Sequence, residues 1–204
     1  MGSQSTSITS SSFHDCKSFC MSVNNAIGLT VNNNVFFNGR VFHAKAEMVN
    51  HFTFNNNLMI GVTRRPTLPI NELISCLSIY EAIHDNGVSI KNNICQGSAL
   101  HGFVLPHIPC DRLSSPPYSN NMAGSTGVAF IFNKVPGNCM GITGVRAYAS
   151  GIGQIASPAG NSQVIFENFI VADCGRAATL RFGREGTDNT AYFRNSFITA
   201  ISRP

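Results

Sequence analysis

Tryptophan is absent from this 204-residue chain, and only 12% of its residues are charged. Globular domains usually contain about 25% charged residues, so this chain has less charge to keep its surfaces apart. Fourteen basic and ten acidic residues give a net charge of +4, without a dense basic cluster interleaved with aromatic residues. Nucleic-acid binding requires such a cluster. We therefore expect no nucleic-acid partner, and we expect the chain to pack against other protein chains.

Long apolar runs are also missing. The chain has no stretch of about 18 apolar residues, so we expect no membrane-spanning segment. Residues 1–12 are rich in serine and threonine and lack the apolar core of a secretion signal. No Asn-x-Ser/Thr acceptor for N-glycosylation occurs, although asparagine is abundant. P-loop, Rossmann and nucleophile-elbow motifs are absent as well.

What the chain does contain is a recurring phrase in which apolar or β-branched residues surround asparagines. The phrase occurs at 28–37, 50–60 and 87–94, and in a looser form at 164–170 and 191–197. β-Branched and aromatic residues favour strands, whereas asparagine tolerates the left-handed region and turns the chain sharply. We therefore predict structural turns at Asn33, Asn56, Asn93, Asn168 and Asn195.

The spacing of the phrase points to stacked repeats. A unit of about 23 residues with short strands and sharp turns is about one coil of a right-handed parallel β-helix. A single coil cannot bury its apolar face, so neighbouring coils must stack. An antiparallel sandwich with asparagine-rich loops is the alternative, but a sandwich requires no register between distant turns. The sequence therefore predicts an all-β solenoid.

Proline and serine clusters divide the chain. Residues 1–22 are expected to form a flexible or capping segment, and residues 23–204 the parallel β-helix. Prolines interrupt the pattern at 64–71 and again at 106–118, and proline is excluded from the interior of a sheet. We expect both segments to leave the stack as loops. Neither end has an obvious polar cap, which favours association through the coil ends.

Seven cysteines are present, and their spacing fits no paired zinc-binding pattern. This number suits an oxidising compartment, and the odd count leaves one thiol free or paired between chains. Cys95 occupies the position that Phe36 has in the first repeat, so we expect it to face the core. Cys110 and Cys139 flank a loop-rich region and are the preferred candidates for a disulfide.

Catalytic side chains are few. Polysaccharide cleavage requires paired carboxylates, or calcium ligands beside a base, and the ten acidic residues form no Asp-x-Asp or Asp-Asp motif. The candidates are His84 with Asp85 as an oriented base, together with His101 and Asp173. His101 and His107 could also bind one metal, but turn or groove-edge positions explain each residue equally well. We expect no metal and no cofactor.

Four phrases in the second half resemble a known family. They are SNNMAGSTGV at 119–128, GNC at 137–139, GVRAY at 144–148 and VIFENFIVAD at 164–173. Their order resembles the parallel β-helix (PbH1) repeats of fibrocystin and fibrocystin-like proteins, and the resemblance extends over residues 25–200. It implies a β-helix of an extracellular protein, at the cell or ciliary surface, with a scaffolding, adhesion or receptor-like role.

The same resemblance includes relatives that degrade hyaluronan at the cell surface. Two functions therefore follow as expectations. The first is a non-catalytic structural and interaction module, a rigid scaffold that binds protein partners, further copies of itself or glycans through its lateral faces and coil ends. The alternative is a polysaccharide-acting enzyme of the hyaluronan- or pectin-degrading type, or a carbohydrate-binding fragment. Convergence of the candidate residues in a groove would favour the enzyme.

Overall fold

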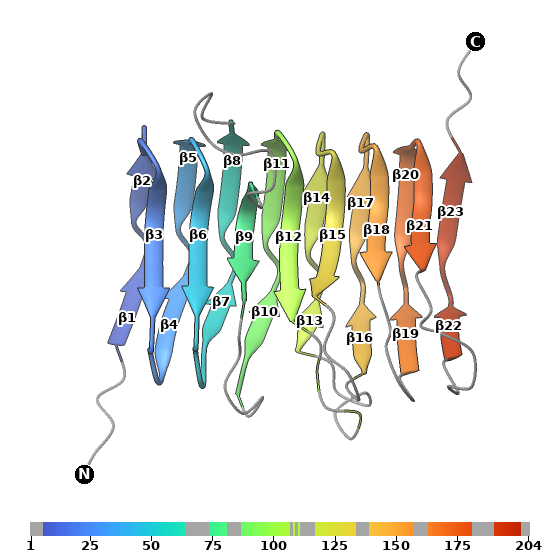
Figure 1. Cartoon of the computed structure of the whole chain (residues 1–204), viewed down its shortest axis with the longest axis horizontal. Helices are drawn as coiled ribbons and strands as arrows, with labels where there is room; N and C mark the ends of the chain where they lie inside the picture. The colour runs from blue at the N-terminus through green and yellow to red at the C-terminus, as the bar shows by residue number, and fades with distance from the viewer. Residues whose placement is uncertain are drawn as a thin grey trace.

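The computed structural model of the chain describes residues 6–63, 74–80, 87–106, 108, 110, 117–133, 139–156, 163–180 and 190–200. These residues form three parallel sheets that run along one long axis, because successive coils of the chain stack on one another. We name the sheets A, B and C. In Figure 1, sheet C lies in front, sheet B lies behind it in the upper part of the view, and sheet A lies behind it in the lower part. The parallel β-helix predicted from the repeats is confirmed.

Successive strands of the chain join sheets A, B and C in turn, and the last described coil contributes strands only to sheets A and B. Sheet A contains β1 (Thr6–Thr9), β4 (Leu29–Asn32), β7 (Thr53–Asn55), β10 (Ser89–Lys91), β13 (Tyr118–Ser119), β16 (Met140–Thr143), β19 (Gln163–Glu167) and β22 (Thr190–Arg194). Sheet B contains β2 (Ser12–His14), β5 (Val35–Gly39), β8 (Leu58–Val62), β11 (Ile94–Ser98), β14 (Met122–Gly124), β17 (Arg146–Tyr148), β20 (Ile170–Cys174) and β23 (Phe197–Ala200). Sheet C contains β3 (Phe19–Asn24), β6 (Phe42–Glu47), β9 (Ser75–Ile79), β12 (His101–Pro106), β15 (Val128–Asn133), β18 (Ile152–Ala156) and β21 (Arg176–Leu180).

The repeat length varies along the stack. Hydrogen-bonded residues of neighbouring coils are 23 positions apart at first, then 36 and 28, and later 24. The two long intervals contain the two segments in which prolines interrupt the pattern. Segment 64–71 lies outside the described residues. Of segment 106–118, Pro106 ends β12 and Tyr118 begins β13, and Ile108 forms an antiparallel bridge with Cys139.

The stack begins earlier than the sequence indicated. Thr6 pairs with Leu29, and Phe13 pairs with Phe36, so residues 6–24 already form a coil. The described part of segment 1–22 thus belongs to the first coil, at one end of the stack. Its strands continue the pattern because Ile8 and Phe13 pack against the core, while serine and threonine alternate with them on the outside.

A left-handed corner connects sheet A to sheet B in every coil that the structure describes. The corner residue has a φ between 49° and 64°, and asparagine tolerates this region better than most residues. The corner residues are Ser10, Asn33, Asn56, Asn92, Asn120, Gly144, Asn168 and Asn195. The prediction of Asn93 as the turn residue is wrong, because Asn92 makes that corner.

The residue after the corner is a buried asparagine in four successive coils. This asparagine ladder consists of Asn34, Asn57, Asn93 and Asn121, each at most 1% exposed. Each of the first three donates a side-chain N–H to Oδ1 of the next at 2.9–3.0 Å. Each also donates its backbone N–H to the same oxygen, at 2.9–3.1 Å. In the next two coils, Val145 and Phe169 take this position.

Inward side chains form columns that fill the interior. Phe103 stacks on Phe130 with ring centroids 5.1 Å apart, and Phe166 stacks on Phe193 at 4.6 Å. Phe103, Phe130 and Phe166 are fully buried, and burial of such a side chain stabilises the fold by about 1.5–3 kcal/mol. Each coil thus contributes apolar surface to both of its neighbours, as a solenoid requires.

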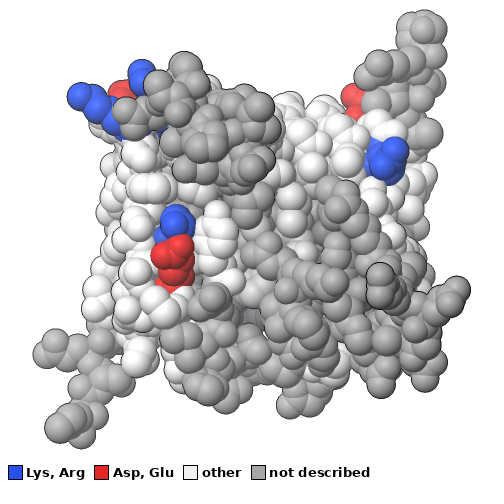
Figure 2. Space-filling model, in the orientation of Figure 1, with Lys and Arg blue, Asp and Glu red and all other residues white. Residues whose placement is uncertain are grey.

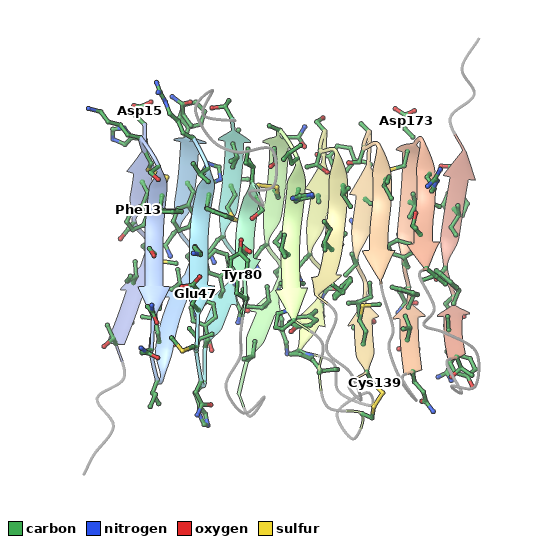
Figure 3. All side chains as sticks on the ribbon, in the orientation of Figure 1. Phe13, Asp15, Glu47, Tyr80, Cys139 and Asp173 are labelled. Carbon is green, nitrogen blue, oxygen red and sulfur yellow. A yellow bond between two sulfur atoms is a disulfide. The ribbon has the colours of Figure 1, made fainter. Side chains whose placement is uncertain are left out.

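Three disulfides occur among the described cysteines. Cys110 and Cys139, the pair selected from the sequence, are bonded to each other, and the bond is visible near Cys139 in Figure 3. Cys95 is fully buried in the position expected for an inward residue, and it is also bonded to Cys76. The third bond joins Cys16 to Cys20, and Cys174 is a free, buried cysteine.

Candidate functional site

The structure does not bring the described catalytic candidates together. His101 begins β12 in sheet C, whereas Asp173 lies near the end of β20 in sheet B. Their coils are three strand spacings apart, which corresponds to about 14 Å along the stack. Asp173 is exposed and points away from the ribbon (Figure 3). His84 and Asp85 lie outside the described residues.

His101 has the most unusual surroundings of these candidates. Burial lowers its pKa, and the nearby backbone carbonyl of Ile74 partly opposes this effect. Its register partner is Ser75. Nδ1 of His101 and Oγ of Ser75 are both buried and lack hydrogen-bond partners, so the two side chains do not form the hydrogen bond of a nucleophile and its base. Among the described residues, no cluster of three or more His, Cys, Asp or Glu side chains could hold a metal.

His43 is a second buried imidazole, which the sequence did not single out. It is fully buried in β6, and Nε2 accepts a hydrogen bond from the backbone N–H of Gly39 at 3.2 Å. Burial lowers the pKa of His43 to about 4. The ring is therefore neutral at physiological pH, and its contact with Gly39 gives it a structural role at the turn between β5 and β6.

The outer face of sheet A is polar, and its amide side chains bond along the stack. The backbone N–H of Asn55 donates to Oδ1 of Asn32 at 3.1 Å, and that of Lys91 donates to Oδ1 of Asn55 at 2.8 Å. Outward threonine and serine side chains at Thr30, Thr53 and Ser89 form the neighbouring row. Because coil-to-coil bonds already use the amide oxygens, this face serves the stability of the stack.

The outer face of sheet B is mainly apolar from β5 onward. Along each strand, buried residues such as Phe36, Met59 and Cys95 alternate with residues that point outward. We define the sheet B face by its outward residues Ser12, His14, Val35, Phe37, Leu58, Ile60, Ile94, Gln96, Met122, Gly124, Arg146, Tyr148, Ile170, Ala172 and Phe197.

Large apolar side chains are unusually exposed on the sheet B face. Five of the ten exposed large hydrophobic residues in the described chain lie there: Val35 (39%), Phe37 (50%), Ile94 (36%), Ile170 (36%) and Phe197 (61%). Scattered apolar residues are normal on a protein surface, but a contiguous patch marks a site of interaction. The sheet B face is therefore the strongest candidate for a functional surface in the described part of the chain.

A tyrosine lies flat across the middle of this face. The hydroxyl of Tyr148 hydrogen-bonds to Oε1 of Gln96, two strands away, and the ring passes over Gly124. A Cβ atom at Gly124 would lie 2.1 Å from the Tyr148 ring. Nε2 of Gln96 donates a hydrogen bond to Oγ of Ser125 at 2.9 Å. These contacts hold the side chains of Tyr148 and Gln96 in place across the centre of the sheet B face.

Charge is sparse on the surfaces that the structure describes. Figure 2 shows the side with sheet C, where charged side chains occupy only a few separate spots. Lys45 and Glu47, both in β6 of sheet C, form an ion pair at 2.6 Å. On the sheet B face as defined above, Arg146 is the one charged residue. Depletion of charge is typical of the centre of protein–protein interfaces.

Comparisons with protein-family models, curated proteins and solved structures found no match for this chain. Within the described ranges, the chain has no helix that is both long enough and apolar enough to cross a membrane.

Sequence reasoning missed the sheet B face, although its signal is present. In Val35-Phe36-Phe37 and Leu58-Met59-Ile60 every residue is apolar, so neither face of the strand is marked as external. A strand exposed to water on one side normally alternates apolar and polar residues. Apolar residues at both inward and outward positions are typical of strands that are covered on both sides.

Proposed function

We propose that this chain is a non-catalytic structural and interaction module, a rigid β-helix whose sheet B face binds a partner. The observation that carries the proposal is the contiguous, nearly uncharged apolar surface on that face. The asparagine ladder supports it, because buried amides that bond from coil to coil hold the sheet flat and in register. The partners proposed are protein chains, further copies of this chain, or glycans.

An extracellular or cell-surface location, including the ciliary surface, is part of this proposal. Three disulfides support it, because such bonds persist in oxidising compartments. The resemblance of residues 119–173 to fibrocystin-like β-helix repeats agrees with that location. Expression in a secretory host and in a reducing cytosol, followed by thiol alkylation and mass spectrometry, tests it. We expect one free thiol and a folded chain from the first host, and loss of folded yield from the second.

The polysaccharide-acting alternative has less support from the geometry. His101 and Asp173 are separated along the stack by about 14 Å, beyond the separation of two carboxyl groups in glycosidases, which is about 5–9.5 Å. Incubation with hyaluronan and with pectin, followed by light scattering to measure polymer length, tests this alternative. We expect no shortening of either polymer. Shortening that disappears in the variant His101→Ala or Asp173→Asn would overturn the non-catalytic proposal.

Accessibility of the sheet B face can be measured directly. We expect the chain to be retained on a phenyl matrix, and retention to fall in the variant Phe37→Ser. The matched control is Thr53→Ser on the polar face of sheet A, which should leave retention unchanged. Equal retention of all three proteins would show that the sheet B face is not the adhesive surface.

A further inference from the structure

We propose that two copies of this chain pack face to face through the sheet B face, with the two rods antiparallel. This rests on the proposed function, because it names the partner of the same surface. The apolar residues on this face run from β5 to β23 without a cluster of charge. A surface of this kind matches another apolar and flat surface, and a second copy provides one of the same length.

The dimensions of the face set the strength of this contact. Eight strands are separated by seven spacings, which gives a length of about 34 Å, and five residues of strand give a width of about 16 Å. The footprint is then roughly 550 Å² per copy, at the lower end of specific interfaces, where about 800 Å² per partner is standard. We therefore expect a reversible dimer with a Kd on the order of micromolar.

Arg146 decides the relative direction of the two rods. It lies on β17, the sixth of the eight strands in sheet B. With parallel rods each strand faces the same strand of the other copy in the reverse direction, so both Arg146 side chains lie on one pair of facing strands in a dehydrated interface, which is unfavourable. With antiparallel rods the sixth strand faces the third, β8, and Arg146 lies opposite Leu58. The aliphatic part of the arginine side chain can then cover the leucine.

The first strand, β2, faces the eighth, β23, which places the small polar Ser12 opposite Phe197 at each end of the contact. The remaining strands pair apolar residues. The second strand faces the seventh, which places Val35 opposite Ile170 and large Phe37 opposite small Ala172. The fourth faces the fifth, which places Ile94 opposite Met122. Apolar residues thus meet apolar residues on both sides of the centre. Pairs of large and small side chains allow two flat sheets to approach closely.

Sedimentation equilibrium of the full 204-residue chain, from about 1 µM to about 100 µM, tests the dimer around a micromolar Kd. We expect a monomer–dimer equilibrium. Ile94→Asp should weaken it by roughly thirtyfold or more, because each copy brings a charge to the centre of the interface. The control variant Thr53→Asp, on the face of sheet A, should dimerise like the unmodified chain. Circular dichroism checks that each variant is folded, and Phe37→Ser replaces Ile94→Asp if the latter is not.

Leu58→Glu tests the direction of the rods. In the antiparallel arrangement the new carboxylate faces Arg146 of the other copy, so the dimer should tighten roughly three- to tenfold at low salt and lose this gain at about 1 M salt. In a parallel arrangement both carboxylates lie on one pair of facing strands, opposite the apolar Ile60 and away from Arg146, so the same variant weakens the dimer. The double variant Leu58→Glu/Arg146→Glu should weaken the antiparallel dimer again.

Three results would overturn the proposal. They are a monomer at all concentrations, a dimer that neither Ile94→Asp nor Phe37→Ser weakens, and a weaker dimer in Leu58→Glu. A monomeric chain that is still retained on the phenyl matrix overturns the dimer alone, and the sheet B face then binds a different partner. Loss of the proposed function is recognised separately, by polymer shortening or by equal retention of the face variants.

Discussion

The side chain of Asn57 holds Asn34 by two hydrogen bonds to one oxygen. Oδ1 of Asn57 accepts both the side-chain N–H and the backbone N–H of Asn34, each at 3.0 Å. The other side-chain N–H of Asn57 donates to the carbonyl of Val31 at 2.9 Å. One buried amide thus satisfies backbone groups in the preceding coil, which explains why an asparagine, not an apolar residue, takes this position.

Replacement of this amide should destabilise the chain strongly. Asn57→Val leaves the N–H groups of Asn34 and the carbonyl of Val31 buried without partners, and each such group costs about 1–3 kcal/mol. We expect the free energy of unfolding to fall by about 3–5 kcal/mol, measured by urea denaturation. The control is Asn56→Gly, because glycine accepts the φ of 56° at that corner. Equal effects of the two changes would contradict the role of the ladder.

Acid should destabilise the protein through His43. The pKa of His43 is about 4 in the folded chain against 6.5 for an ordinary histidine, so the unfolded state binds one more proton between these values. Stability is therefore full above pH 6.5 and falls as the pH drops towards 4, by at most about 1.4 kcal/mol per pH unit and about 3 kcal/mol in total.

The measurement for His43 is the urea midpoint at several pH values. The variant His43→Gln keeps an acceptor for the N–H of Gly39 and removes the titrating group. We expect it to lose most of the decrease in stability between pH 6.5 and 4. The lowered pKa of His101 acts in the same direction, so a smaller slope should remain. An unchanged slope in His43→Gln would show that His43 is not the source.

Gly102 should not tolerate a side chain. A Cβ atom there would lie 2.4 Å from the carbonyl oxygen of Ala129 and 2.8 Å from the Cβ of Ala123. Both contacts are with atoms that cannot rotate away, so Gly102→Ala forces neighbouring coils apart. We expect a loss of about 1–3 kcal/mol in chemical denaturation. Gly28→Asn is the control, because nothing lies within 4 Å and asparagine tolerates its φ of +73°; a similar loss there would exclude the clash as the cause.

Removal of the bond between Cys76 and Cys95 should weaken the middle of the stack. The bond closes a separation of 19 residues, for which chain entropy predicts a stabilisation of about 3 kcal/mol. The double variant Cys76→Ala/Cys95→Ala should lose this amount in urea denaturation, plus a small term for two lost sulfur atoms in the core. Alkylation of the unmodified chain should label a single thiol, Cys174, and only after unfolding, because Cys174 is buried.

The sequence predicted the coil but not the role of each asparagine within it. In the triplet Asn55-Asn56-Asn57 the first residue lies on the outer face, the second makes the corner, and the third joins the ladder. In the later copy, Lys91 takes the outer position, so only Asn92 and Asn93 remain. The pair Asn92-Asn93 does not indicate which of the three positions, outer, corner or ladder, is missing. This explains why Asn93 and not Asn92 was predicted as the turn residue.

Two other features depend on contacts that sequence separation conceals. Cys76 in β9 and Cys95 in β11 both point into the core from successive coils, and the lengthened interval from Asn57 to Asn93 hides this register in the sequence. The sheet B face escapes detection because Phe36, Met59 and their outward neighbours are all apolar. Composition predicted sparse charge and association, but the choice of face requires knowledge of which residues point inward.

The ladder stops at Asn121, and the next coils have Val145 and Phe169 in its place. Because each coil contacts only its neighbours, the two parts of the rod have separate local stabilities. Amide protons of Asn34, Asn57 and Asn93, held by side-chain oxygens inside the rod, should exchange with deuterium most slowly. Exchange should be fastest at the carboxyl-terminal coils, from which loss of structure then spreads inward until it reaches the last buried amide.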